Sequence, residues 1–337
     1  MRGILQLVIA LKDPAGLQPT KPSALCRGLF VFMKQPKKFL TYEEQVELLK
    51  KKKLKIENDE QTILYLKRCS YYSLISGYKD IFKIEKNGDY RPDASIEKIA
   101  DLYVFDEYLR NIFLHKIINI EKTIKSLYSY SFCQMFGETQ EDYLNINNYN
   151  YANSKYRTDI NRFISTLENI IQNPEKHPYV DYNISTYGTV PFWIIIQVLT
   201  FGTISKMFTF SKEQLQSQVS REFNDIYPIQ LSSMLSVLTK FRNVCAHGER
   251  LYNYKTRKEL LDLPLHKEID YNGKKNDLFN VCICFKYLLP LTEFKSFIEI
   301  VLNGLLVNTE DVLGDYYYNE LLKSMGFPND WKQILLK

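Results

Sequence analysis

A long stretch of helical periodicity that follows Ser95 constrains the fold of this chain more than any other feature. Its apolar side chains recur at helical spacing, at Ile96, Ile99, Leu102, Tyr103, Leu109, Ile112 and Phe113. This spacing predicts an amphipathic helix, and Ser95 is a favourable N-cap for it. We expect the helix to continue to about Phe136, with its apolar stripe buried against other elements.

Most of the remaining chain also has helical spacing. Further helices are expected over residues 42–53, 59–69, 157–172 and 211–223, from 228 to 247, and over 278–306 with an interruption at Pro290. Residues 186–208 predict a turn and then a helix that starts at a proline and has Gly202 in its interior or near its end. One hairpin is expected over residues 80–92, with Asn87-Gly88 as its turn. The predicted fold class is all-α, with a small β-hairpin in the N-terminal segment.

Composition narrows the class of protein. Of the 337 residues, 45% are hydrophobic and 25% are charged, which is ordinary for a soluble globular protein, and the net charge of +5 mildly favours an anionic partner. The six cysteines form no C-x-x-C pair or Cys/His cluster, so neither a zinc site nor a disulfide framework is predicted. There is no P-loop or dinucleotide fingerprint, and we expect no cofactor. Reduced thiols and the lack of an apolar run of about 18 residues predict a cytoplasmic protein without a membrane span.

Three regions are expected along the chain. Residues 1–32 contain a short apolar run with no clean cleavage site after it, and Met33 opens a stretch that resembles a natural start. We interpret residues 1–32 as an extension that is poorly ordered or the product of an upstream start codon. Residues 33–92 would form an N-terminal helical and hairpin segment, and residues 93–337 the main helical domain.

The stretch KFRNVCAHGERLYNY, residues 240–254, contains one of only four histidines. His247 stands in the last turn of an expected helix, with Gly248 as its stop, so it would satisfy free carbonyl groups there in one interpretation. In the other interpretation it performs chemistry. Asn243 lies four residues earlier and shares a helical face with His247, and the adjacent Arg242 is long enough to reach the same cleft. An arginine, an amide and an imidazole together can act on a phosphate without a metal.

The motif resembles a known family. Arg242-Asn243-x-x-x-His247 is similar to the R-x4–6-H signature of the HEPN superfamily of ribonucleases, and the Abi-like (abortive-infection) family continues as Arg250, Tyr252 and Asn253 do here. Four more blocks resemble that family in its order, over residues 39–56, 65–78, 102–126 and 190–208. One position departs from a common pattern: Glu249 replaces the tyrosine of HEPN toxins that a nucleotidyltransferase modifies, which argues against that subtype.

The resemblance implies a HEPN-like helical bundle with metal-independent endoribonuclease activity, acting as an abortive-infection toxin. RNA supplies its own nucleophile, the 2′-OH. His247 would donate a proton to the 5′-oxygen leaving group, and Arg242 would neutralise the developing charge on the phosphate. Asn243 would orient the histidine or a phosphate oxygen. RNA contacts would come from Arg250, Tyr252 and Asn253. The alternative function is a non-catalytic module that grips RNA phosphate with the same motif.

A single histidine leaves the second proton-transfer group unassigned. HEPN enzymes pair two motifs, usually across a dimer, so the resemblance implies a homodimer and a silencing partner that is a protein or a small RNA. Arg110, Asn111 and His115 repeat the spacing of the motif within the chain. They form an internal second motif in one interpretation; in the favoured one, Arg110 is structural and His115 is incidental.

Two other segments have alternative interpretations. The basic run from Lys50 to Lys55 is interpreted as a solvated helix end, or else as a contact to the RNA backbone. The Asn- and Tyr-rich stretch over residues 145–156 is interpreted as a surface loop, or else as a platform on which unpaired bases stack.

Overall fold

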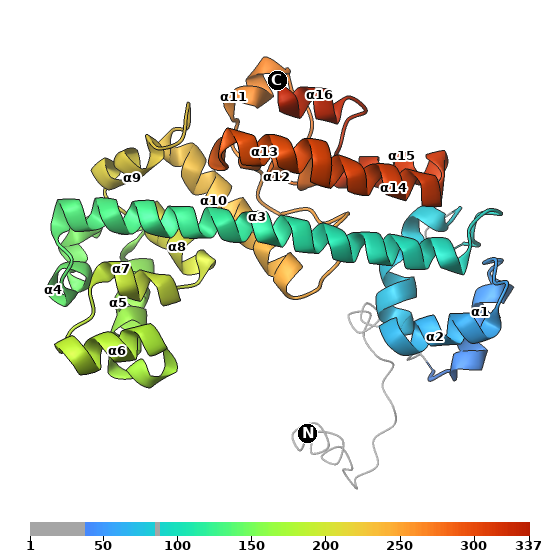
Figure 1. The fold of residues 1–337 in the computed structure, drawn as a ribbon, viewed down its shortest axis with the longest axis horizontal. Coiled ribbons are helices and arrows are strands. Elements are labelled where there is room, and N and C mark those ends of the chain that lie inside the picture. Colours follow the sequence, from blue (N-terminus) through green and yellow to red (C-terminus); the bar gives the residue numbers. More distant parts are fainter. Residues whose placement is uncertain (1–37, 85–87) are drawn as a thin grey trace, which may run out of the picture. The chain divides into compact units, whose positions relative to one another are not determined.

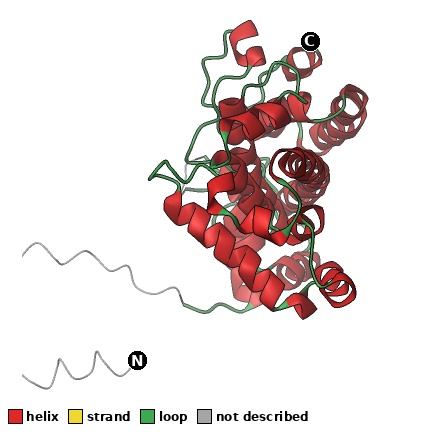
Figure 2. Cartoon of the chain, turned by 90° about the vertical axis from the view of Figure 1, so that its left-hand side faces the viewer, coloured by secondary structure: helices red, strands yellow, loops and turns green. Residues whose placement is uncertain are grey.

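The computed structural model describes residues 38–84 and 88–337 of the chain. Every regular element in these residues is a helix, and Figure 2 shows no strand among them, which confirms the predicted all-α fold class. Residues 42–337 form one compact unit, so residues 42–92 belong to the same unit as the helices that follow them. The predicted extension over residues 1–32 lies outside the described residues.

The long helix α3, Ile96–Phe136, has the bounds expected from the sequence. The Ser95 hydroxyl accepts a hydrogen bond from the backbone N–H of Lys98 at 3.3 Å and caps the first turn. Gly137, with φ of +100°, ends the helix in a conformation that favours glycine. Figure 1 shows α3 running through the molecule as the element around which the others are arranged.

In the described residues before α3 there are two α-helices and two short helical turns. The helices are α1, Tyr42–Lys51, and α2, Asp59–Cys69. Asn58 caps α2, because its side-chain oxygen accepts from the N–H of Gln61 at 3.0 Å. A π-helical turn, Tyr72–Ser76, and a 3-10 turn, Lys79–Phe82, then return the chain toward α3.

The predicted hairpin over residues 80–92 is wrong. Its described residues contain only an isolated antiparallel bridge between Lys83 and Tyr90, and Asn87 of the expected turn lies outside the described residues. Two backbone hydrogen bonds flank this bridge, from the Ile84 N–H to the Asp89 carbonyl at 3.1 Å and from the Arg91 N–H to the Phe82 carbonyl at 2.9 Å. The pairing extends no further because the segment before Lys83 is the 3-10 turn Lys79–Phe82, whose backbone cannot continue a strand.

Six α-helices lie between α3 and α10 (Pro228–Ala246). These are α4, Gln140–Leu144; α5, Arg157–Gln172; α6, Pro178–Tyr187; α7, Phe192–Ile195; α8, Phe201–Thr209; and α9, Glu213–Ser220. The single helix expected after the proline at 191 is broken in two, because Leu199 and Thr200 are extended. The Thr200 hydroxyl then caps α8 by accepting from the N–H of Thr203 at 3.2 Å.

Helix α10 and six further helices complete the unit. They are α10, Pro228–Ala246; α11, Pro264–Glu268; α12, Leu278–Leu288; α13, Leu291–Ser296; α14, Asn303–Leu313; α15, Asp315–Met325; and α16, Trp331–Leu336. The start of α10 at Pro228 and the interruption at Pro290 confirm the expectations from the sequence. A π-helical segment, Phe297–Leu302, joins α13 to α14.

The core lies on both sides of α3, which packs against α7, α9, α10 and α14. Aromatic contacts join α3 to helices far along the chain: the ring centroids of Phe132 and Phe192 are 4.5 Å apart, and those of Phe113 and Phe285 are 5.5 Å apart. Because α10 packs against α3, the residues at the C-terminal end of α10 are held beside α3.

The described cysteines are all free thiols, at Cys69, Cys133, Cys245, Cys282 and Cys284, and Cys26 lies outside the described residues. Cys282 and Cys284 are fully buried in α12, as packing residues are. In the described ranges, no helix combines the length and the apolar character that crossing a bilayer requires.

Candidate active site

The C-terminal end of α10 has a Schellman motif that presents His247 to solvent. The backbone N–H of Glu249 donates to the carbonyl of Val244 at 3.0 Å, and that of Gly248 donates to Cys245 at 3.3 Å. Gly248 has φ of +67°, the left-handed conformation that a C-terminal stop needs, which confirms the predicted helix end. Backbone N–H groups thus satisfy the last carbonyls of α10.

The imidazole of His247 is exposed, and in the described part of the chain it makes no hydrogen bond or ion pair. The capping interpretation of this side chain is therefore wrong, because the Schellman motif satisfies the carbonyls without it. Asn243 is exposed four residues earlier, so its amide and the imidazole lie on one face of the helix. The structure brings these two predicted residues together at a solvent-accessible end of α10.

Arg242 is directed toward α3. Its Nε atom lies 3.9 Å from Oε2 of Glu121 and is buried without a hydrogen-bond partner among the described residues. Glu121 also pairs with Lys125 at 3.0 Å, and the Lys125 ammonium donates to the carbonyl of Gln197 at 3.0 Å. The Arg242 side chain is 35% exposed, so α3 holds one side of the guanidinium while part of the side chain remains accessible.

A buried polar cluster on α3 holds the loop that follows the motif. The Asp106 carboxylate accepts from the backbone N–H groups of Leu251 at 3.0 Å and Tyr252 at 2.7 Å, and from the Tyr78 hydroxyl at 2.8 Å. Arg110 completes the cluster through a 2.6 Å ion pair with Asp106. Burial raises the pKa of the Asp106 carboxyl, and these four donors oppose the rise.

The proposed second motif does not form a site in this structure. Arg110 is only 7% exposed, and its guanidinium is occupied by Asp106 and Tyr78. His115 and Asn111 are exposed on α3, whereas the Arg110 guanidinium is directed into the buried cluster around Asp106. The buried ion pair of Arg110 favours the interpretation in which this arginine is structural and His115 is incidental.

Of the three predicted RNA contacts that follow the motif, Tyr252 is the one that the structure buries. Its ring is 1% exposed and stacks on Tyr78 with the ring centroids 5.8 Å apart. Arg250 is partly exposed; it donates to the carbonyl of Gly77 and lies 3.7 Å from Asp80, so it also anchors the loop. Asn253 is half-buried. These residues position the motif more evidently than they offer a surface to RNA.

Sequence reasoning missed two acidic residues that the geometry brings to the site, Asp106 and Glu121. The only signal for Asp106 was its i,i+4 spacing from Arg110, which is also typical of a surface ion pair. Cys245 lies within the motif, and burial raises the pKa of its thiol to about 12, which disfavours a reactive thiolate at neutral pH. Within the described residues, no group of three or more His, Cys, Asp or Glu side chains has an arrangement that could hold a metal ion.

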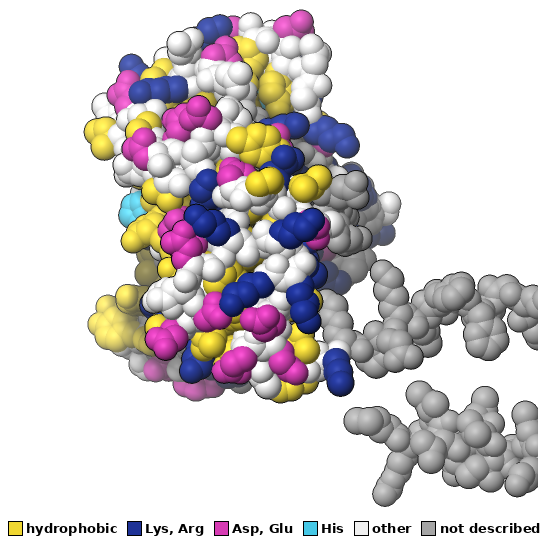
Figure 3. All heavy atoms as spheres, turned by 90° about the vertical axis from the view of Figure 1, so that its right-hand side faces the viewer, with side chains coloured by type: hydrophobic (Ala, Val, Ile, Leu, Met, Phe, Trp, Pro, Cys, Tyr) yellow, Lys and Arg dark blue, Asp and Glu magenta, His cyan; other side chains and the backbone are white. Residues whose placement is uncertain are grey.

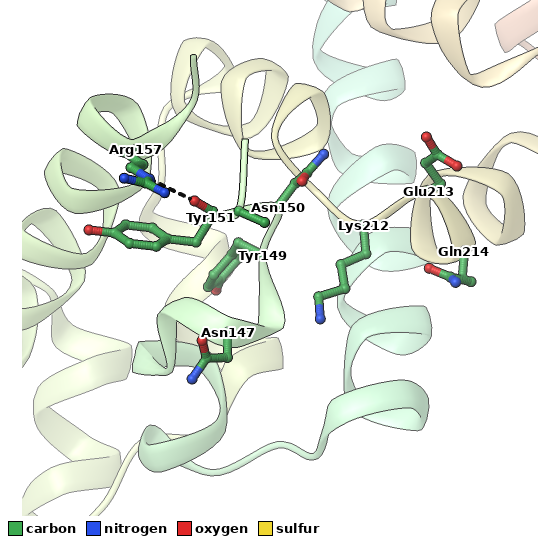
Figure 4. A pocket seen from close by; sticks show the side chains of 9 residues that line it. Asn147, Tyr149, Asn150, Tyr151, Arg157, Lys212, Glu213 and Gln214 are labelled. Atoms are coloured by element: carbon green, nitrogen blue, oxygen red, sulfur yellow. Dashed lines mark hydrogen bonds between the residues drawn. The ribbon is translucent and has the colours of Figure 1, made fainter. Parts of the chain in front are cut away.

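The Asn- and Tyr-rich loop surrounds a polar cavity of about 530 Å³ that contains no motif residue. Figure 4 shows Arg157 and Lys212 on opposite sides of it, with the Arg157 side chain donating to the carbonyl of Tyr151 at 3.1 Å. Tyr149 is 2% exposed, and the Arg157 guanidinium lies 5.5 Å from the centroid of the Tyr151 ring. These rings are already covered, which favours the surface-loop interpretation over base stacking.

The basic run near α1 is largely paired. Lys50 lies 2.6 Å from Asp59, Lys53 lies 2.6 Å from Asp89, and Lys55 is also in an ion pair. On the side of the molecule that carries α1, α2 and α15, Figure 3 shows basic and acidic side chains interspersed. This favours the interpretation of the run as a solvated helix end over an RNA contact.

Comparison with known proteins agrees with these features. A family model described as Abi-like protein matches residues 64–253, from α2 through the end of α10 and the loop held by Asp106. No curated protein and no solved structure matches the chain. The matched stretch is more than half of the sequence, and the protein therefore belongs to the family of Abi-like proteins.

Proposed function

We propose that this protein is a metal-independent endoribonuclease that acts as an abortive-infection toxin. The observation that carries the proposal is the end of α10. There an exposed imidazole, which has no partner among the described residues, shares a helical face with Asn243 and stands beside a partly exposed arginine. Family membership supports a role in abortive infection, because Abi-like proteins are named for it. The RNase chemistry is inferred from the residues.

His247 is proposed to transfer the proton that cleavage requires. The 2′-oxygen of RNA attacks the adjacent phosphorus, the bond to the 5′-oxygen breaks, and a proton must reach that leaving oxygen. Imidazole exchanges protons near neutral pH, and an exposed ring without a competing partner is free to meet an RNA strand. Asn243 is proposed to hold the imidazole or a phosphate oxygen through its amide.

Arg242 is proposed to bind the phosphate. Its ion pair with Glu121 is long, at 3.9 Å, and the buried Nε makes no hydrogen bond in the described part of the chain. Little interaction energy is therefore lost when the guanidinium leaves this ion pair and binds an incoming phosphate, which offers two charge-assisted hydrogen bonds. Glu121 would then keep Lys125 as its partner and leave no acidic group unpaired.

The product ends test this chemistry. Purified protein is incubated with RNA in excess EDTA, and the termini of fresh products are determined. Internal attack by the 2′-oxygen yields a 2′,3′-cyclic phosphate and a 5′-hydroxyl, and a 2′-deoxy sugar at the cleavage position blocks the cut. A strict Mg²⁺ requirement that RNA folding does not explain, or 5′-phosphate ends, would refute the mechanism.

We further propose that two copies of the His247 motif act together in a homodimer, because one histidine cannot be both acid and base on opposite sides of one phosphate. Mixing wild-type protein with a chain carrying Arg242→Ala and His247→Ala is expected to lower activity below simple dilution of the wild type. Active protein should elute as a dimer. A fully active monomer that His115→Ala disables would overturn the composite site.

A toxin of this kind requires control, and we propose a silencing partner that is a protein or a small RNA. Glu249 stands two residues after His247, where HEPN toxins that a nucleotidyltransferase modifies have a tyrosine. A carboxylate cannot receive the same modification as a phenol. Silencing in this protein would therefore rest on a bound partner.

A further inference from the structure

A cavity beside α10 continues directly from the proposed active site. It has a volume of about 350 Å³, is lined by α5, α8 and the C-terminal half of α10, and includes Asn243 of the motif. This volume falls at the lower end of the range for small-ligand sites. The cavity, here called the α5–α8–α10 cavity, is used by none of the chemistry derived so far.

The stripe of α10 that lines this cavity also carries His247. Ser236, Lys240 and Asn243 all line the cavity and are spaced i, i+4, i+7. His247 follows Asn243 by four residues, so the same face leads from the cavity to the imidazole. Lys240 and His247 are separated by about 10 Å along the helix axis. A ligand in the cavity and a phosphate at His247 would therefore be close neighbours.

The charges of the cavity favour an anion. Arg162, Lys206 and Lys240 contribute positive charge, and Asp159 is the one acidic residue in the lining. Asp159 lies 3.6 Å from Arg162 and 3.5 Å from Lys206, whereas the exposed Lys240 has no ion-pair partner in the part of the chain that the structure describes. Lys240 is thus an unneutralised ammonium on the side nearest the motif.

The rest of the lining suits a sugar and a base. Hydroxyl groups of Thr200, Thr203 and Ser236 face the cavity, and Phe163 and Phe210 supply an apolar part of its wall. Phe163 and Phe210 are only 4% and 2% exposed, so they give a base an apolar wall and not a free face for stacking. Lys240 suits the phosphate of a nucleotide, and the hydroxyl groups suit its ribose.

We propose that the α5–α8–α10 cavity binds one nucleotide of the RNA strand next to the phosphate that is cut. The proposal rests on the proposed function, since it places the cleaved phosphate at His247. Lys240 contacts the phosphate of the bound nucleotide, and the cavity wall holds its sugar and base. The cavity would thereby fix the register of the strand and supply any preference for the neighbouring nucleotide.

Gly202 provides a way to block the cavity without changing its charge. A Cβ at this position would lie 3.4 Å from the Thr239 methyl and 3.8 Å from the Thr200 hydroxyl, both in the cavity lining. Its backbone has no positive φ, so α8 tolerates a side chain there. Gly202→Leu would fill the space, whereas Gly202→Ala adds one methyl group in ordinary contact.

The test measures binding of a short 2′-O-methyl RNA, which cannot be cut, to the full chain. Lys240→Gln is expected to weaken binding and to reduce the slope of log K against log salt by about 0.7. Gly202→Leu is expected to weaken binding about tenfold with the salt slope retained, and Gly202→Ala to have a smaller effect. Lys323→Gln, on the exposed surface of α15, is the matched control and should bind as wild type. Thermal melting shows that each variant is folded.

Two results would overturn the proposal. In the first, folded Lys240→Gln and Gly202→Leu bind the RNA with wild-type affinity. In the second, the cavity binds ribonucleoside monophosphates and these variants abolish that binding, but they leave RNA binding unchanged. The second result would identify an effector site instead of an RNA site. Because 2′-O-methyl RNA binding needs no cleavage, a wild-type protein that never cuts RNA refutes the proposed function and leaves the cavity test readable.

Discussion

Replacing His247 by alanine is expected to lower the rate of RNA cleavage by about 10²–10⁴-fold, the usual contribution of a positioned general acid or base. The side chain is exposed and stabilises nothing in the described residues, since backbone groups alone close the end of α10. The variant should therefore fold as wild type and retain RNA affinity within a few-fold. Single-turnover cleavage of a labelled RNA, with affinity measured in parallel, separates the two quantities.

His115→Ala and His177→Ala are the matched controls, because each removes an imidazole that lies outside the α10 motif. Both should cleave RNA at nearly the wild-type rate. Inducible expression of wild type and His247→Ala, with total RNA sequenced for new ends, gives the corresponding result in cells. If wild-type protein binds RNA but never cuts it under any condition, the non-catalytic RNA-binding function replaces the enzyme.

The helices that could be predicted from the sequence are those whose bounds are set by local interactions. Capping by Ser95 and the apolar period that follows determine α3, and the bounds of α2 and α5 match the expected segments. The hairpin could not be judged in the same way. Its turn signal is local, but Lys79–Phe82 forms a 3-10 turn instead of the start of a strand, so the described residues form only the bridge between Lys83 and Tyr90.

The candidate site shows the same division. Asn243 and His247 share a face because four residues separate them on a helix, which spacing alone predicts. The direction of Arg242 depends on Glu121, a residue of another helix. Tyr252 resembled a stacking surface in the sequence, yet its backbone N–H is bound by a carboxylate 146 positions earlier and its ring is buried. The orientation of Arg242 and the burial of Tyr252 both depend on contacts with α3, which is distant in sequence, so a local sequence pattern could not predict them.

Replacing Asp106 by asparagine is expected to destabilise the protein by about 3–5 kcal/mol, the cost of leaving a buried charge unpaired. Asp106 is fully buried, and its loss removes the negative partner of Arg110. The amide also accepts fewer hydrogen bonds than the carboxylate, which now receives two backbone N–H groups, a hydroxyl and a guanidinium. Urea unfolding at neutral pH measures the change in the free energy of unfolding.

The same substitution should loosen the loop that follows His247, because Asp106 holds the N–H groups of Leu251 and Tyr252. Hydrogen exchange of those two amides is expected to rise more than that of amides within α10. Glu320→Gln removes one partner of an exposed pair at 3.7 Å and should change stability by less than about 1 kcal/mol. A double variant, Asp106→Asn with Arg110→Met, should lose less stability than the two single losses added, since no unpaired charge remains. If Asp106→Asn is as stable as wild type with unchanged exchange at Leu251 and Tyr252, the cluster does not hold the loop, and the position of His247 depends on α10 alone.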